Sequence, residues 1–263
     1  MSEPRKPLRS DMAWTTADSI TVRGLDLPGE IMGRLNLGDF AFLEIKGRIP
    51  TPQESVVFNA MLATLVEHGM TPMSIAARMV YLGAPESLQA AVAAGLCGIG
   101  STFAGTAEAA ARMLQEALSD PDTENDLPQL ARGIVAAHIA SRRNIPGLGH
   151  TTHKPVDPRS IRLFAIAAEN GLAGRYVELM QLIAAEAERA MGKPGDLPVN
   201  VTGALGALAS EMDIPWKLCR GLAVIGRAIG IVGHLAEEQR APMARDIWKQ
   251  VEEESSSHRR RSP

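Results

Sequence analysis

Apolar residues recur at the three- and four-residue spacing of an α-helix along most of this 263-residue chain, and glycine or proline interrupts the pattern at short intervals. Aromatic residues make up only 4% of the sequence, and alanine, leucine, glycine and methionine dominate the composition. Because strands are enriched in aromatic and β-branched residues, this composition favours closely packed helices over sheets. We therefore predict an all-α fold.

The pattern also predicts where the elements lie. Helices are expected at residues 54–67, 72–82, 85–97, 108–118, 128–143, 159–170, 173–191, 203–212 and 215–237, with short helical patterns in 28–46 and an extended segment at 19–23. Residues 1–18 are expected to form a loose polar arm. The tail from Glu252 has blocks of glutamate, serine and arginine, which are typical of a disordered end.

Size, charge and cysteine content limit the classes of function. The length allows one large domain or two modest ones, and 45% hydrophobic residues suffice for a core. A net charge of −3 argues against nucleic acid or an anionic membrane as the main partner. We see no apolar run of about 18 residues and no signal core, so no membrane span is expected. Cys97 and Cys219 lie in apolar contexts and are predicted to be buried thiols in a reducing compartment, which favours a cytoplasmic location.

One segment combines residues that suit proton transfer and anion binding. Gly147-Leu148-Gly149-His150 places a histidine after a glycine-rich turn, and Asp157-Pro158-Arg159 follows shortly afterwards. A histidine exchanges a proton near neutral pH, and an arginine fork holds a carboxylate with two parallel hydrogen bonds. The pair suggests chemistry on a carbon next to an anionic group, although a single histidine or arginine more often has a structural role.

Several further motifs follow one another in a recognisable order. They are Glu67 to Pro72 with Arg78, Gly95-Leu96, Gly100 to Gly105, Gly147 to Arg159, Asn200 to Gly203, and Ile225 to Arg227 through Gly233-His234 to Arg240 and Arg245. In this order they resemble the citrate synthase superfamily over nearly the whole chain, and most closely its short citryl-CoA lyases and the C-terminal lyase module of ATP-citrate lyase.

The resemblance implies an architecture and a partner copy. Members of this family are all-α homodimers, in which each protomer has a large and a small helical domain with the active site in the cleft between them. Here the large domain is expected to comprise residues 1–102 and 226–263, of which 1–18 and 252–263 are flexible. The small domain is expected to comprise residues 103–225.

The resemblance also assigns roles to residues. His68, Arg159 and Arg227, together with Arg245 from the partner subunit, match positions that bind the carboxylates or the carbonyl of the substrate. His150 matches the histidine that exchanges a proton with the substrate oxygen. Three guanidinium groups in one cleft repel each other unless an anion is bound, so the set is consistent with an anion clamp.

Two positions depart from the pattern of citrate synthases. Phe103 replaces the histidine that stabilises the enolate oxygen, as a phenylalanine also does in ATP-citrate lyase. Thr202 replaces the catalytic aspartate that moves the methyl proton of acetyl-CoA. A threonine hydroxyl cannot act as a carboxylate base, and loss of a general base costs on the order of 10²–10⁴ in rate. Glu211 and Asp213 are expected to lie at least two helical turns away and to be poor substitutes.

Coenzyme A is implied by the resemblance more than by any motif. Lys154 and Lys193 are candidates for its phosphates, although both also fit ordinary surface lysines. The chain has no Walker A motif, so it gives no sign of ATP use. No cluster has metal-ligand spacing, because His150 and His153 lack a third ligand nearby. For His234 a structural role is expected.

Three functions remain open at this point. The first is a CoA-dependent carbon–carbon lyase or synthase that acts on citryl-CoA, or a related 3-hydroxy-3-carboxy acyl-CoA, and gives acetyl-CoA and oxaloacetate. The second is a diverged member with another acyl-CoA substrate or reaction, in which His150 is the only proton-transfer group. The third is a non-catalytic protein that binds a dicarboxylate, a tricarboxylate or an acyl-CoA. Thr202 favours the second function, and the retained histidines and arginines favour the first.

Overall fold

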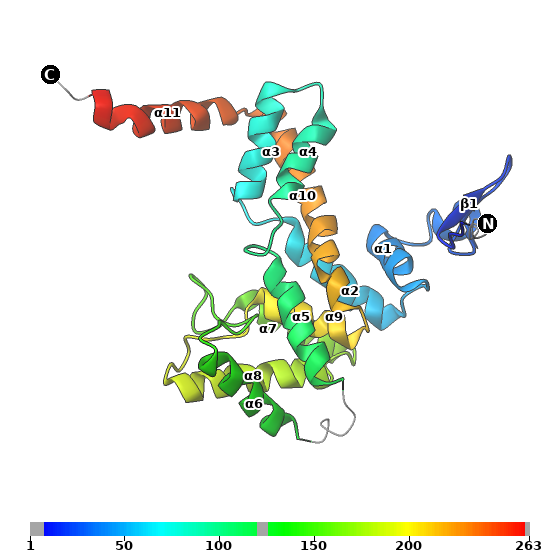
Figure 1. The fold of residues 1–263 in the computed structure, drawn as a ribbon. Coiled ribbons are helices and arrows are strands. Elements are labelled where there is room, and N and C mark those ends of the chain that lie inside the picture. Colours follow the sequence, from blue (N-terminus) through cyan, green and yellow to red (C-terminus); the bar gives the residue numbers. More distant parts are fainter. Residues whose placement is uncertain (1–7, 120–125, 261–263) are drawn as a thin grey trace, which may run out of the picture.

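The computed structural model describes residues 8–119 and 126–260, and these form a mostly helical fold (Figure 1). Its helices are α1 (Leu37–Lys46), α2 (Pro52–Val66), α3 (Pro72–Gly83), α4 (Leu88–Cys97), α5 (Gly105–Ala117), α6 (Leu127–Ala140), α7 (Pro158–Glu169), α8 (Arg175–Met191), α9 (Val201–Glu211), α10 (Cys219–Arg240) and α11 (Ala244–Arg260). The short helical turns are η1 (Leu27–Ile31) and η3 (Trp216–Leu218). The predicted all-α class is confirmed.

Side chains that cap the free backbone N–H groups fix where several helices begin. Thr51 and Glu54 form a reciprocal capping box at the start of α2, and Pro52 occupies the first turn. Thr71, Asp157 and Asn200 accept hydrogen bonds from the first turns of α3, α7 and α9. Because these signals are local, the predicted starts of these helices lie within about two residues of the observed ones.

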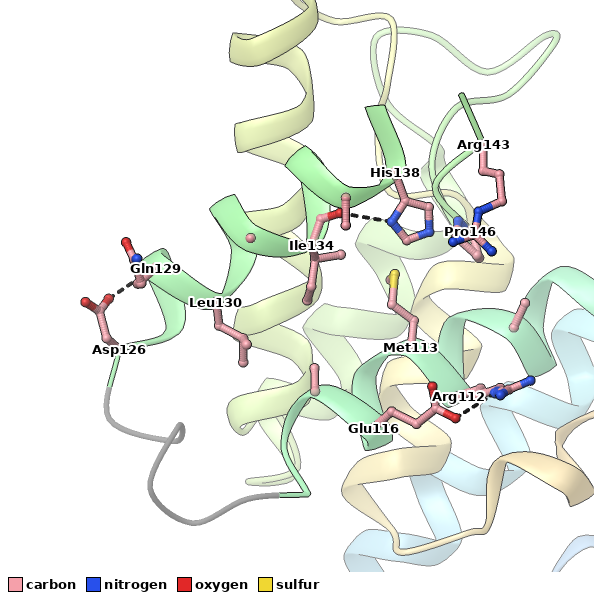
Figure 2. Close-up of a pocket in the computed structure, with 14 residues that line it drawn as sticks. Arg112, Met113, Glu116, Asp126, Gln129, Leu130, Ile134, His138, Arg143 and Pro146 are labelled. Carbon is pink, nitrogen blue, oxygen red and sulfur yellow. Dashed lines mark hydrogen bonds and ion pairs between the residues drawn. The ribbon is translucent and has the colours of Figure 1, made fainter. Parts of the chain in front are cut away.

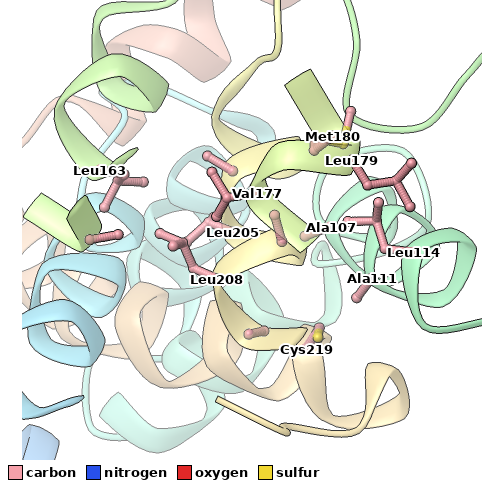
Figure 3. Packing of buried hydrophobic residues seen from close by; sticks show 14 of the residues in the cluster. Ala107, Ala111, Leu114, Leu163, Val177, Leu179, Met180, Leu205, Leu208 and Cys219 are labelled. Atoms are coloured by element: carbon pink, nitrogen blue, oxygen red, sulfur yellow. The ribbon is translucent and has the colours of Figure 1, made fainter. Parts of the chain in front are cut away.

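One large hydrophobic core holds the lower part of the molecule together (Figure 3). It is formed where α5 packs on α9, α6 on α8, and α7 on α2 and α9. Small residues such as Ala107, Ala111 and Ala207 are completely or almost completely buried there beside Leu114 and Leu208. This close packing of alanine and leucine explains how a chain with few aromatic residues builds a dense core.

α10 connects this lower part to α3 and α4 at the other end of the molecule (Figure 1). It crosses α2 at Gly226 and Gly230, where the backbone of Leu62, Leu65 and Val66 leaves no room for a Cβ atom. The crossing brings the C-terminal end of α2 against the middle of α10. The functional residues that follow α2 therefore lie beside those of α10.

α10 with η3, residues Trp216–Arg240, is also long and apolar enough to cross a membrane by length and composition, which differs from the sequence expectation. Half of its most apolar window is buried inside the protein, and its buried residues include Arg227 and His234. These contacts are those of a core helix, and one such helix is weak support for a membrane span.

The expectations for the two ends of the chain were wrong in detail. The N-terminal arm is not entirely irregular, because β1 (Ala13–Thr15) pairs with β2 (Ile20–Val22), which pairs with β3 (Leu25–Asp26), in an antiparallel sheet of order β1-β2-β3. The tail is helical as far as Arg260, and the Glu238 carboxylate caps the start of this helix by accepting the Ala244 amide. The arm before residue 8 and the tail after residue 260 lie outside the described residues.

Cys97 was predicted to be buried, but it is exposed. Gly95, two residues earlier in α4, faces Ile231 of α10 and the backbone of Met73 in α3. Two residues along a helix correspond to a rotation of about 200°, so Cys97 points to the opposite side. Cys219 is buried as predicted, and desolvation raises the pKa of its thiol to about 12.

Candidate functional site

The loop that carries His150 is joined by backbone hydrogen bonds to the segment just before α9. The Gly149 amide donates to Pro198 O at 2.8 Å, the Asn200 amide donates to Gly147 O at 2.9 Å, and Leu148 forms an isolated bridge with Val199. These bonds bring the glycine-rich turn, some 50 residues earlier in the sequence, to the N-terminus of α9. His150 and Thr202 therefore belong to one site.

Two glycines make this approach close enough. A Cβ atom on Gly147 would lie 2.5 Å from the Cα atom of Gly203, and a Cβ atom on Gly203 would lie 2.5 Å from Gly147 O. Gly147 also has a φ angle of +85°, which side chains rarely adopt. Neither position can hold a larger residue unless the loop moves away from α9.

Asp157 fixes the orientation of Arg159. It is completely buried, and its two carboxylate oxygens accept hydrogen bonds from four donors: the Arg159 amide, Nε and Nη2 and the Val201 amide, at 2.8–3.0 Å. Burial alone raises the pKa of Asp157, but the bonds from Arg159 and Val201 outweigh it and lower the pKa, so the carboxylate is charged. One carboxylate thus aligns the guanidinium group with the start of α9.

His150 presents a single N–H group to the site. Its Nδ1 atom accepts hydrogen bonds from the amides of Thr152 and His153, both at 3.0 Å, so a neutral ring carries its proton on Nε2. Desolvation, followed by the charges of His153 and Arg159, lowers the pKa of His150 and favours this neutral form. Arg159 Nη2 directs an N–H group toward His150 Nε2 at 3.4 Å, and this contact joins two donors in the tautomer that the Thr152 and His153 amides set. Two donors that close together suit an oxygen atom of an anionic substrate.

Thr202 lies at the first turn of α9, and its hydroxyl is already used. It donates to Asn200 Oδ1 at 2.7 Å, and Asn200 in turn donates through Nδ2 to Gly149 O at 2.8 Å. The proton of the Thr202 hydroxyl therefore points back to the helix cap. The oxygen retains lone pairs that can accept a hydrogen bond, but it offers no carboxylate for proton abstraction.

Phe103 and Arg227 adjoin this turn through two small cavities. One, of about 30 Å³, is lined by Phe103, Thr202, Cys219 and neighbouring apolar residues. The other, of about 60 Å³, is lined by Phe103, Arg227, Met73 and further apolar residues. Phe103 is half-exposed at the junction of α4 and α5 and separates the Thr202 turn from the arginine.

Arg227 is a buried cation with an unused donor. Arg227 is only 8% exposed, and its Nη1 atom has no hydrogen-bond partner among the described residues. Desolvation lowers the pKa of Arg227, while the charge of Glu67 opposes the shift. A buried guanidinium group without a full set of acceptors is costly, and an anionic ligand would satisfy it.

The remaining predicted residues are placed as follows. His68 is exposed after the end of α2, near enough to His150 for its charge to lower the pKa of that ring. Lys154 and Lys193 are exposed on either side of Asp196, which pairs with Lys154 Nζ at 2.9 Å. Arg245 is exposed on α11, which projects away from the rest of the chain (Figure 1). Within one protomer the structure does not bring Arg245 to the other residues.

A larger groove lies elsewhere, between α5 and α6 (Figure 2). It has a volume of about 900 Å³, an apolar floor that includes Met113, Leu130 and Ile134, and cationic side chains from Arg112 and Arg143. None of the predicted site residues lines it. Its size alone does not identify it as the reaction site.

Sequence reasoning missed the residues that hold the site in shape. Asp157 was noted only as part of a turn, although an aspartate before proline at a helix start is a typical capping signal. Glu67 was quoted only as part of a motif. Among residues 8–119 and 126–260 no group of three or more histidine, cysteine, aspartate or glutamate residues could hold a metal ion.

Comparisons with known proteins identify the family and the fold. The family model described as citrate synthase, C-terminal domain, matches residues 31–249. The structure of citryl-CoA lyase from Hydrogenobacter thermophilus superposes with a TM-score of 0.80 at 34% identity and covers 89% of this chain and 87% of that one. ATP citrate lyase from Methanothrix soehngenii, in complex with citrate and coenzyme A, shares the fold with a TM-score of 0.73 at 23% identity, over 90% of this chain and 40% of that one.

Among curated sequences, the probable ATP-citrate synthase of Dictyostelium discoideum is 25% identical over 256 residues, which are 90% of this chain. The chain spans only 39% of the length of that relative.

Proposed function

Because the chain belongs to the citrate synthase family, we propose that it is a CoA-dependent lyase that cleaves citryl-CoA into acetyl-CoA and oxaloacetate. The observation that carries the proposal is the pair His150 Nε2 and Arg159 Nη2, 3.4 Å apart beside the Thr202 turn, which Phe103 connects to the buried Arg227 through two small cavities. The similarity to a citryl-CoA lyase over almost the full length of both chains supports it.

Each group has a part in this reaction. Arg159, Arg227 and His68 bind the carboxylates of the citryl group, since guanidinium groups pair with carboxylates through two hydrogen bonds. His150 donates a hydrogen bond through Nε2 to the oxygen that is a hydroxyl in citryl-CoA and a carbonyl in oxaloacetate, and the hydroxyl gives its proton to water in the cleft. The carbon–carbon bond then breaks, and its electrons pass to the acetyl-CoA enolate.

The enolate carbon must finally take up a proton. In citrate synthases an aspartate serves this position, whereas here Thr202 has a hydroxyl that already donates to Asn200. We propose that water in the cleft delivers the proton. Proton transfer at this carbon should then be slow in comparison with a family member that has the aspartate, which deuterium incorporation into acetyl-CoA will measure.

Coenzyme A is the proposed acyl carrier, as in the relative that binds it. Lys154 and Lys193 both lie near Asp196, so they form one exposed basic edge beside the His150 loop. We propose that this edge binds a CoA phosphate. Lys154→Ala and Lys193→Ala should each raise the KM for the CoA substrate, with little change of kcat. An unchanged KM in both variants would leave the edge as an ordinary surface pair.

The proposed assembly is a homodimer. Arg245 is far from the other predicted residues of its own chain on a projecting helix, which suits a residue that completes the site of a partner subunit. Sedimentation velocity of the purified protein will measure whether it is a dimer. Mixing inactive His150→Ala with inactive Arg245→Ala protomers should restore part of the activity if the residues act in one shared site. The two-domain division and a cytoplasmic location remain predictions.

The decisive test is cleavage of citryl-CoA by the purified protein, with released oxaloacetate followed through malate dehydrogenase and NADH. Turnover that disappears in His150→Ala is expected. Absence of turnover by the wild type, together with calorimetric binding of citrate or CoA, would instead favour the third function named above, a non-catalytic binder. The hydroxyl of Thr202 in place of a carboxylate is the observation that favours that candidate.

A further inference from the structure

A chain of polar contacts begins at Glu67, directly after α2, and leads to the buried residues His234, Arg78 and Glu238. The Glu67 carboxylate accepts hydrogen bonds from the amide of His68 at 2.8 Å and from the amide of Gly69 at 2.5 Å. Its Oε1 atom also lies 3.1 Å from His234 Nε2 on α10. One carboxylate therefore holds the backbone of the turn that carries His68.

The neighbouring contacts fix the proton of His234. Arg78 Nη2 lies 2.9 Å from His234 Nδ1, and a guanidinium group can only donate, so Nδ1 is the acceptor. The ring proton is then on Nε2, from which it is donated to Glu67. His234 is 9% exposed and satisfied on both nitrogens, in agreement with its predicted structural role.

This series of polar contacts continues to the start of α11. Arg78 is completely buried, donates to Glu238 Oε2 at 2.7 Å and also pairs with Glu237. The other oxygen of Glu238 accepts hydrogen bonds from the amides of Met243 and Ala244, at 3.0 and 2.9 Å, and so caps α11. Glu67, His234, Arg78 and Glu238 thus form a continuous relay from the His68 turn to the helix that carries Arg245.

The location of Glu67 is hard to explain by stability alone. It is the C-cap residue of α2, where the carbonyl groups of the helix end repel a negative charge. Its side chain is 52% exposed, and its buried partner, the His234 ring, needs only a hydrogen-bond acceptor there and not a charged group. The Glu67 carboxylate instead accepts the amides of the turn that follows the helix. Its negative charge also acts on Arg227.

We propose that Glu67 and His234 are positioning residues that set the His68 turn for the substrate, and that the relay through Arg78 and Glu238 couples this turn to α11. The inference rests on the proposed function, because it gives the relay a purpose in binding the citryl group. It adds two residues that do not touch the substrate. It also predicts that the site of one protomer responds to the placement of the helix that serves its partner.

The test combines kinetics with amide hydrogen exchange on the full-length protein. His234→Ala removes the bridge, whereas His234→Gln supplies an amide oxygen for Arg78 and an amide N–H for Glu67. Glu54→Gln is the matched control. Glu54 is a carboxylate at the opposite end of the same helix, which likewise accepts a backbone amide and pairs with a cation.

In His234→Ala and Glu67→Ala, we expect the KM for citryl-CoA to rise about tenfold, with kcat changed less, because ligand contacts depend on ångström-scale placement. In His234→Ala, exchange should rise at residues 67–71 and also at 243–247. His234→Gln should recover most of both effects. Glu54→Gln should leave KM and both segments unchanged.

Unchanged exchange at residues 67–71 in His234→Ala would overturn the relay, whatever the activity. Increased exchange with KM and kcat like those of Glu54→Gln would overturn the positioning role. If wild-type protein does not turn over citryl-CoA, the proposed function fails separately. The Kd for citrate, measured by calorimetry, then replaces KM, and if citrate does not bind either, the exchange results alone decide the relay.

Discussion

Replacing Asp157 by asparagine tests whether a single buried carboxylate assembles the site. The wild-type oxygens each accept two of the four donors, from Arg159 and Val201. Asparagine keeps one acceptor oxygen and replaces the other by an amide that is itself a donor. Two of the four hydrogen bonds are therefore lost. The two N–H donors that made them then face the NH2 group of the asparagine side chain.

Two lost bonds at about 1–1.5 kcal/mol each predict a decrease of about 2–3 kcal/mol in the free energy of unfolding. Arg159 is partly exposed and can be solvated again, so the cost stays below the 3–5 kcal/mol typical of a broken buried ion pair. For a chain of this size each kcal/mol corresponds to about 2–4 °C, so the Tm should fall by roughly 5–10 °C. A displacement of Arg159 by about 1 Å should reduce kcat/KM about 10²-fold.

Denaturant unfolding and citryl-CoA cleavage at a temperature well below the new Tm measure the two effects separately. Asp126→Asn is the control, since Asp126 also caps a helix by accepting the Gln129 amide, and asparagine caps equally well. Its stability and activity should match the wild type. The reasoning is refuted if Asp157→Asn also behaves like the wild type, or if its activity falls only as far as its folded fraction does.

Three further predictions address the base, the helix crossing and acid stability. Thr202→Asp should raise condensation of acetyl-CoA with oxaloacetate by about 10² or more, since it restores a general base; no change in the coupled assay would mean that the cleft has diverged beyond this residue. Gly230→Ala should destabilise the protein by about 1–3 kcal/mol in urea, because the new methyl group collides with Val66 O at the α2–α10 crossing, whereas Gly233→Ala, with open space around it, should not. Arg48 and the Thr51 cap lower the pKa of Glu54 to about 2, against partial desolvation. The resulting stability is complete above about pH 4.5 and lost as the pH falls towards 2, so Glu54→Gln should flatten the acid side of the stability curve; an unchanged curve contradicts this.

The helices were predictable because their signals are local. Periodic apolar positions identify the face to be buried, and threonine, aspartate or asparagine before proline or glycine marks where a helix begins. α11 was missed for a related reason. Its start is capped by Glu238 from the preceding helix, and Trp248 and Val251 on its surface remain exposed in one chain. Its apolar positions Ala244, Ile247, Trp248 and Val251 do follow helical spacing, but the charge blocks after Glu252 were interpreted as disorder.

The candidate site was predictable in its residues more than in its geometry. His150, Arg159 and Thr202 were singled out from motifs, and the structure places them around the start of α9. Their meeting depends on the contact between Gly147 and Gly203, which lie far apart in the sequence. Periodicity carries no information about such a pair, because it describes each helix separately.

The sequence by itself determined the helical class, the ends of most helices and the chemistry available to the site, since propensity, capping and side-chain type are properties of short segments. Only the tertiary structure decided which charges are compensated. Asp157 neutralises Arg159, Glu67 holds the His68 turn, and Arg227 keeps an unused buried donor. These differences arise from burial and from contacts between distant segments, and they set the pKa values and hydrogen-bond needs on which binding depends.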